Sequence, residues 1–108
     1  MENKTEVPEN LILITTFKNT LKDEIIENDY YFTSDFKRYT LYRSEKDGEA
    51  YVMVLIDSFP NINSMLEAVG RDAVSQRVKS GEIQNIYEYM QVHSEISKYI
   101  RSCAYPNL

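Results

Sequence analysis

The stretch that decides the expected fold lies at residues 38–56, which read RYTLYRSEKDGEAYVMVLI. Two runs rich in β-branched and aromatic residues, 38–44 and 50–56, flank a polar stretch that contains Asp47-Gly48. An Asp-Gly pair supplies the positive φ angles that tight hairpin turns require. We therefore expect two antiparallel strands joined at this turn.

The segment after this hairpin has a helical pattern. Residues 59–61 (FPN) end the second strand, and Ser64 with Glu67 forms the sequence of a capping box. Apolar residues then recur at helical spacing, and Gly81 stands where a C′ glycine ends a helix. A long amphipathic helix over residues 64–80 is the expectation.

The segment before the hairpin predicts a strand and a short helix. Residues 11–17 (LILITTF) are apolar on both alternate faces, which is typical of a buried strand. Asn19 or Thr20 can cap a helix that follows. Its apolar stripe would consist of Leu21, Ile25 and Ile26. The aromatic-rich residues 28–36 show no clear period.

The two ends of the chain complete the expected order of elements. Residues 86–93 alternate, which predicts a half-exposed strand with Tyr87, Tyr89, Gln91 and His93 on one face. Ser94 can cap a last short helix. Residues 1–9 are polar and are expected to form a flexible leader, so that residues 10–108 make a single domain.

This order of elements predicts an α+β fold of the ferredoxin-like βαββαβ type, with an antiparallel sheet in the order 4-1-3-2 and a C-terminal helix. In that sheet the strands at 11–17 and 50–56 are central, and both read as apolar on their two faces. Because helices cover only one face of such a sheet, the other face needs a partner. We therefore expect a homodimer, with the sheets of two copies packed face to face.

The hairpin at 39–59, the helix at 64–80 and the closing strand at 86–89 resemble the dimeric α/β-barrel superfamily, especially antibiotic-biosynthesis-monooxygenase-like and stress-responsive barrel proteins. The resemblance covers residues 11–93 as a pattern of elements, without an invariant motif. It implies a dimeric α/β barrel and a small organic ligand in a monooxygenase-like pocket, with no cofactor. The chain departs from the family in having no Trp and in its irregular stretch at 28–36.

Few residues are candidates for lining such a pocket, and none is assigned a catalytic role. The candidates for ligand contact are Tyr87, Tyr89, His93, Tyr51 and Arg43. The tyrosines can equally form an edge or a dimer contact, and Arg43 can form a salt bridge in place of binding a carboxylate ligand. His93 is the only histidine and has no second ligand at metal-binding spacing, so no metal site is expected.

Charge and apolar pattern exclude several partners. The formal net charge of −5 at pH 7 repels nucleic acid and anionic membranes. The apolar runs are too short to span a bilayer, and the first residues lack the pattern of a secretory signal, so a cytoplasmic location is expected. Cys103 is the only cysteine, so an internal disulfide is impossible.

Three functions stay open at this point. The first is a cofactor-independent monooxygenase-like enzyme, in which polar groups only orient the substrate and stabilise an anion. The second is a non-catalytic homodimer with a stress-response or regulatory role. The third is an ACT-like ligand-sensing module, which shares the βαββαβ order but binds through Gly-rich turns, whereas this chain has only 3 glycines.

Overall fold

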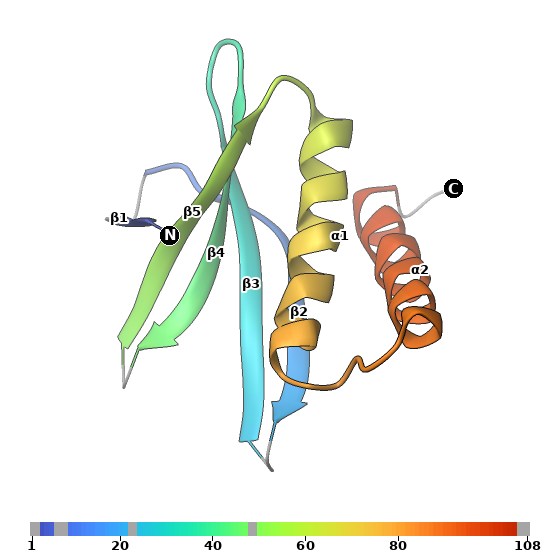
Figure 1. Cartoon of the computed structure of the whole chain (residues 1–108). Coiled ribbons are helices and arrows are strands. Elements are labelled where there is room, and N and C mark those ends of the chain that lie inside the picture. Colours follow the sequence, from blue (N-terminus) through green and yellow to red (C-terminus); the bar gives the residue numbers. More distant parts are fainter. Residues whose placement is uncertain (1–2, 6–8, 22–23, 48–49, 106–108) are drawn as a thin grey trace. The chain divides into compact units, whose positions relative to one another are not determined.

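The computed structural model describes the backbone of residues 3–5, 9–21, 24–47 and 50–105, and the side chains of residues 9–18, 27–45 and 51–105. The order of elements is β1 (Asn3–Thr5), β2 (Ile12–Leu21), β3 (Glu24–Ser34), β4 (Tyr39–Asp47), β5 (Ala50–Phe59), α1 (Ile62–Lys79) and α2 (Ile86–Ala104) (Figure 1). The chain is therefore a small α+β protein in which the described strands come first and the helices last.

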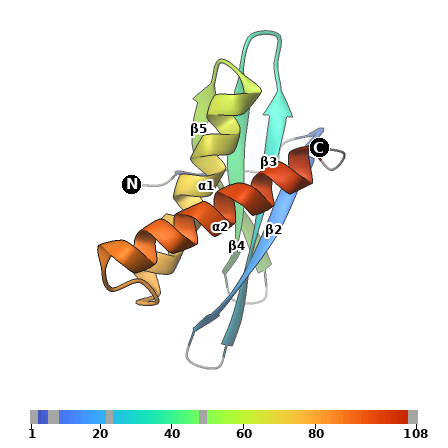
Figure 2. The same ribbon diagram turned by 90° about the vertical axis from the view of Figure 1, so that its right-hand side faces the viewer.

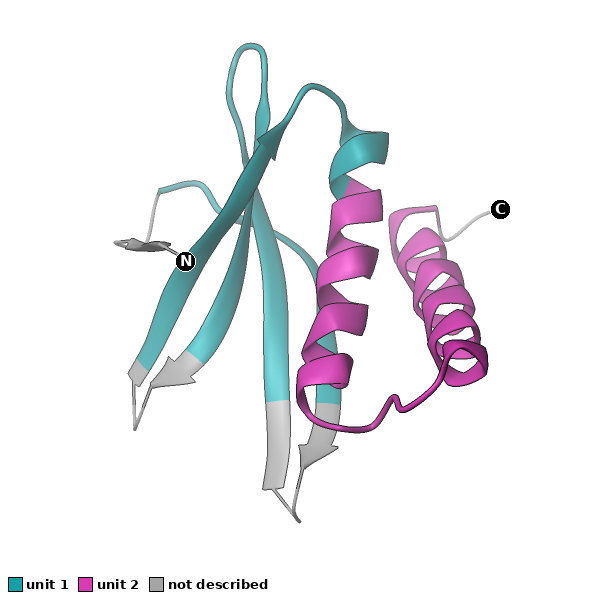
Figure 3. Cartoon of the chain, in the orientation of Figure 1, with its two compact units in different colours: residues 1–65 teal, residues 66–108 magenta. Residues whose placement is uncertain are grey.

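The chain divides into two compact units, residues 1–65 and 66–108 (Figure 3). The first unit holds the sheet and the first turn of α1. The second unit holds the rest of α1 and all of α2.

The sheet is an antiparallel meander in the order β1-β5-β4-β3-β2. The predicted ferredoxin-like fold is wrong, and so is the dimeric α/β barrel built from it, because no helix separates β2 from β3 or β5 from a later strand in the described chain. The ACT-like alternative loses its structural basis for the same reason. Residues 3–5 of the expected leader form β1, and residues 1–2 and 6–8 lie outside the described part.

The predicted helix after Asn19 is wrong because residues 19–26 belong to a β-hairpin. Strands β2 and β3 pair down to Leu21↔Glu24, and the turn residues between them lie outside the described residues. A helix of about two turns is marginal without tertiary support, and β-branched residues such as Ile25 favour a pleated sheet. Pairing with a neighbouring strand, which a local pattern does not reveal, decides the outcome.

Strand β3 also includes most of the stretch that showed no clear period. Its alternation is visible in the burial of its side chains, since Asn28 and Tyr30 are buried while Asp29 and Tyr31 are half-buried. The ring of Tyr30 packs edge-on against Phe17 of β2, with the ring centroids 5.8 Å apart. This contact lies in the core of the first unit.

The predicted hairpin at residues 38–56 is confirmed as β4 and β5, with its Gly48-Glu49 turn outside the described residues. The register shifts after Leu41↔Asp57, since the next pair is Tyr42↔Leu55. Strand β5 has a neighbour on each side, as expected. The prediction that the strand at 11–17 is central is wrong, because β2 is the last strand of the described sheet.

Helix α1 confirms the predicted long helix and corrects its N-terminal cap. The side chain of Asn61 accepts a hydrogen bond from the Ser64 backbone N–H at 2.8 Å, so Ser64 lies inside the first turn and is not the cap. At the other end Gly81 has a φ of 83°, as a C′ glycine requires. Its N–H bonds to the Val78 carbonyl at 3.1 Å, and the following N–H of Glu82 bonds back to α1.

Helix α2 replaces both the predicted strand at 86–93 and the short helix that Ser94 was expected to cap. Asn85 is the N-cap, and its side chain accepts from the Glu88 N–H at 2.9 Å. Ile96 and Ile100 are buried on one side of the helix. Figure 2 shows α2 crossing α1, and a Cβ placed on Gly70 would lie 3.5 Å from Cδ1 of Ile100. Among the described residues, no helix is long and apolar enough to cross a membrane.

Candidate functional site

The structure divides the five predicted ligand-contact residues between the two units. Arg43 lies on β4 and Tyr51 on β5, in the first unit, and they lie on opposite faces of the sheet, because Arg43 pairs with Val54, which is three residues from Tyr51. Arg43 is fully buried, whereas Tyr51 is 60% exposed. The sheet therefore does not bring these two side chains to one site.

The buried Arg43 forms the ion pair that the sequence analysis weighed against ligand binding. Its Nη2 lies 2.6 Å from Oε1 of Glu45, two residues along the same strand face. A guanidinium without contact to solvent needs a nearby anion to compensate for its lost hydration. This contact gives Arg43 a structural role in the first unit.

The remaining three candidates lie on α2, where they form different contacts from those expected of a strand. Residues two apart on a helix point about 200° apart, so Tyr87 and Tyr89 lie on different sides. The rings of Tyr89 and His93 stack, with their centroids 6.2 Å apart and their planes 16° apart. The hydroxyl of Tyr87 accepts a hydrogen bond from Nε2 of Gln91 at 3.0 Å.

A polar cluster on β2, β3 and β4 was missed by the sequence analysis. Asp29 lies at its centre: Thr16 donates to Oδ1 at 2.6 Å and the Tyr31 hydroxyl donates to Oδ2 at 3.5 Å. The backbone N–H of Asp29 donates to Oγ of Ser44 at 3.2 Å. The alternation of polar and aromatic residues along 28–34 is the signal that could have indicated a strand here.

This cluster perturbs one titration. Burial of the ring is the first cause that raises the pKa of Tyr31 above its ordinary value of 10.0, and the charge of Asp29 and the hydrogen bond to it act in the same direction. All three causes favour the neutral phenol. Asp29 and Tyr31, two positions apart on β3, thus form a hydrogen-bonded pair that stabilises the strand surface.

Metal-binding clusters are absent from the part of the chain that the structure describes, where no three His, Cys, Asp or Glu side chains come together. The only thiol, that of Cys103, is exposed near the end of α2.

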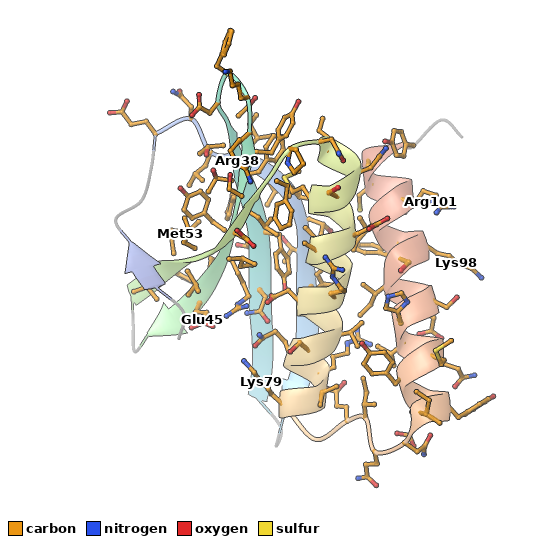
Figure 4. The ribbon with its side chains drawn as sticks, turned by 45° about the horizontal axis from the view of Figure 1, so that its top comes forward. Arg38, Glu45, Met53, Lys79, Lys98 and Arg101 are labelled. Atoms are coloured by element: carbon orange, nitrogen blue, oxygen red, sulfur yellow. The ribbon has the colours of Figure 1, made fainter. Side chains whose placement is uncertain are left out.

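The solvent-facing side of α2 is the second feature that the sequence analysis missed. Three large apolar side chains near its N-terminus, Ile86, Tyr87 and Met90, are 75%, 68% and 61% exposed. Farther along, Lys98 and Arg101 point away from the helix (Figure 4) and form no ion pair with any described residue. The interpretation of residues 86–93 as a strand concealed this side, because it divided the segment at Ser94.

Five of the exposed side chains fall on one line along the helix, which we call the α2 stripe. The α2 stripe consists of Tyr87, Met90, Ser94, Lys98 and Arg101. At 100° per residue these five positions lie within about 80° around the helix axis. The α2 stripe is therefore a continuous surface that is apolar at its N-terminal end and cationic at its C-terminal end.

Comparison with known proteins adds no relative: no protein-family model, curated protein or solved structure matches this chain.

Proposed function

We propose that this chain is a non-catalytic protein that acts as a homodimer, with a regulatory or scaffolding role, and that α2 carries its association surface. The single observation behind this proposal is the exposure of Ile86, Tyr87 and Met90 on one helix. Grouped apolar side chains on a protein surface mark interaction sites, and Tyr, Met and Arg are enriched in the centres of protein interfaces.

The polar groups of the first unit support the same proposal. Asp29 accepts hydrogen bonds from two hydroxyl groups, and Arg43 forms its ion pair with Glu45. These contacts join neighbouring positions of the sheet and account for the side chains structurally. On α2, by contrast, Ile86 and Met90 are apolar side chains that face solvent.

The experiment is a measurement of molar mass by light scattering at micromolar concentration. We expect a dimer for the wild type and a shift toward monomer for the double variant Tyr87→Ala with Met90→Ala. A matched control is Phe36→Ala, because Phe36 is 92% exposed on the β3–β4 loop and offers a large apolar side chain outside α2. A wild type that is monomeric throughout this range contradicts the proposal.

A second candidate function, binding of a small organic molecule, is favoured by the stacked pair of Tyr89 and His93. This pair presents an aromatic surface and an imidazole together, which suits a phenolic or carbonyl compound. A thermal-shift series with small phenols tests it. Stabilisation that His93→Ala abolishes supports ligand binding, and an unchanged melting temperature across the series contradicts it.

A further inference from the structure

The α2 stripe is arranged symmetrically about its middle residue. Tyr87 and Arg101 are each seven residues from Ser94, and Met90 and Lys98 are each four residues from it. All five side chains are exposed. The apolar half and the cationic half of the stripe are therefore equal in length and meet at a small side chain.

Such an arrangement is complementary to itself under a two-fold axis. If two α2 helices lie antiparallel with Ser94 facing Ser94, Tyr87 of one copy faces Arg101 of the other. Met90 of one copy then faces Lys98 of the other, and each contact occurs twice. We infer that the partner of the α2 stripe is a second copy of this chain, bound antiparallel about an axis beside Ser94; this inference rests on the proposed homodimer.

Each facing pair has a favourable chemistry. A guanidinium is attracted to the face of a tyrosine ring. The ring of Tyr87 is held in place by its hydrogen bond from Gln91, so little freedom is lost when the second copy binds. The aliphatic stem of Lys98 can lie along the Met90 thioether while its ammonium stays in water. Ser94 is small enough to let the helix axes come within about 8–10 Å.

The distribution of charge selects the antiparallel arrangement over the parallel one. In a parallel pair, Lys98 would face Lys98 and Arg101 would face Arg101. In the antiparallel pair the two Lys98 residues are separated by about 12 Å along the axis and the two Arg101 residues by about 21 Å, at 1.5 Å per residue. Both distances exceed the screening length of about 8 Å at physiological salt.

An anionic membrane is the other surface that an apolar and cationic helix side can bind. The net charge of −5 opposes approach to such a membrane. The apolar half of the stripe is also small: it consists of Tyr87 and Met90, with the exposed Ile86 beside them. This size matches a short helix contact better than a helix lying along its whole length in a lipid interface. We therefore place the second copy on the α2 stripe.

Disulfide trapping tests the register. In a Cys103→Ser background, Ser94→Cys puts two thiols beside the two-fold axis, at a Cα separation that a disulfide can span. Mild oxidation should then produce a covalent dimer at micromolar concentration. The matched control is Ser102→Cys, since the two copies of Ser102 would be about 24 Å apart along the axis and should not cross-link.

A residue exchange tests the pairing itself. Tyr87→Arg should weaken the dimer at least tenfold, because it places two guanidinium groups together at both ends of the interface and removes the ring. Combining Tyr87→Arg with Arg101→Tyr restores the pair in reversed order and should restore the dimer. Failure of the combined variant to recover, with its circular dichroism spectrum unchanged, contradicts the register.

The outcomes separate this inference from the proposed function. A dimer by light scattering in which Ser94→Cys does not cross-link overturns the register and leaves the homodimer standing. A monomer by light scattering overturns both. Flotation of a monomeric wild type with phosphatidylglycerol vesicles, lost in Lys98→Glu, would assign the α2 stripe to a membrane and overturn the inference.

Discussion

Replacing Gly70 with alanine should stabilise the protein. Gly70 is buried in the interior of α1, where glycine is less favourable than alanine by about 0.8–1.0 kcal/mol. The new Cβ would lie 3.5 Å from Cδ1 of Ile100 and 4.0 Å from Oγ of Ser97, which are ordinary contact distances, so nothing has to move. Filling this position with a methyl group adds up to about 0.8 kcal/mol, and the expected gain is about 1–2 kcal/mol.

The assay is urea unfolding followed by circular dichroism, at one fixed protein concentration because a dimer makes stability depend on concentration. Gly81→Ala is the matched control with the opposite sign. The φ of Gly81 is 83°, and beyond its two chain neighbours no atom lies within 4 Å of the added Cβ, so only the backbone conformation is tested. It should lose about 1–2 kcal/mol. A loss of stability in Gly70→Ala would refute the packing of α1 on α2 described above.

Three further changes have defined outcomes. Arg43→Ala should cost about 2–5 kcal/mol in urea unfolding because it empties a fully buried position and breaks the ion pair with the partly exposed Glu45, and Arg43→Met should cost less because it keeps the volume of the stem. Because the pKa of Tyr31 is raised, the unfolded chain loses the phenolic proton at a lower pH than the folded chain, so stability should fall as the pH rises above about 10. Asp29→Asn should lower the pKa of Tyr31, measured by the phenolate absorbance that is lost in Tyr31→Phe. An unchanged titration in Asp29→Asn would exclude the contact between Asp29 and Tyr31. Asn85→Ala should cost about 1 kcal/mol through loss of the α2 cap, and a smaller loss than that of an exposed control such as Ser102→Ala would contradict the cap.

The parts of the fold that the sequence predicted are those with local causes. The β4–β5 hairpin depends on a turn between adjacent strands, and the end of α1 depends on Gly81, whose positive φ is local as well. The β2–β3 hairpin was missed because residues 19–26 have a weak pattern of either kind, and their state is decided by pairing with the opposite strand.

Helix α2 was missed for a different reason: its first eight residues fit two periods at once. Ile86 and Met90 are neighbours at the helical spacing i, i+4, and they also share one face of the alternating pattern that suggested a strand. Asn85 and Glu88 decide between them, since they form a reciprocal cap in which the Glu88 carboxylate accepts from the Asn85 side chain at 3.1 Å. For residues 86–93, the capping residues therefore distinguish a helix from a strand better than the spacing of the apolar residues does.

The candidate site was harder to predict than the fold, because its contacts depend on register. Thr16 and Asp29 meet only because β2 and β3 pair Thr16 with Asp29, and nothing local in either strand indicates this. The tyrosines of residues 86–93 were predicted as candidates for ligand contact, on one face of a strand. On α2, Tyr89 turns to His93 while Tyr87 joins the exposed side.

Strands that read as apolar on both faces were the first reason to expect a second copy of the chain. Met53 and Val54, on opposite faces of β5, are both buried within one chain, whereas Tyr51 of the same strand is 60% exposed. Part of the doubly apolar pattern of β5 is therefore covered without a partner sheet. Three large apolar side chains of α2, Ile86, Tyr87 and Met90, are each more than 60% exposed. The α2 stripe contains two of them and is complementary to its own reverse. The homodimer is therefore expected to form through α2. Light scattering tests the dimer itself, and Ser94→Cys in a Cys103→Ser background tests its register.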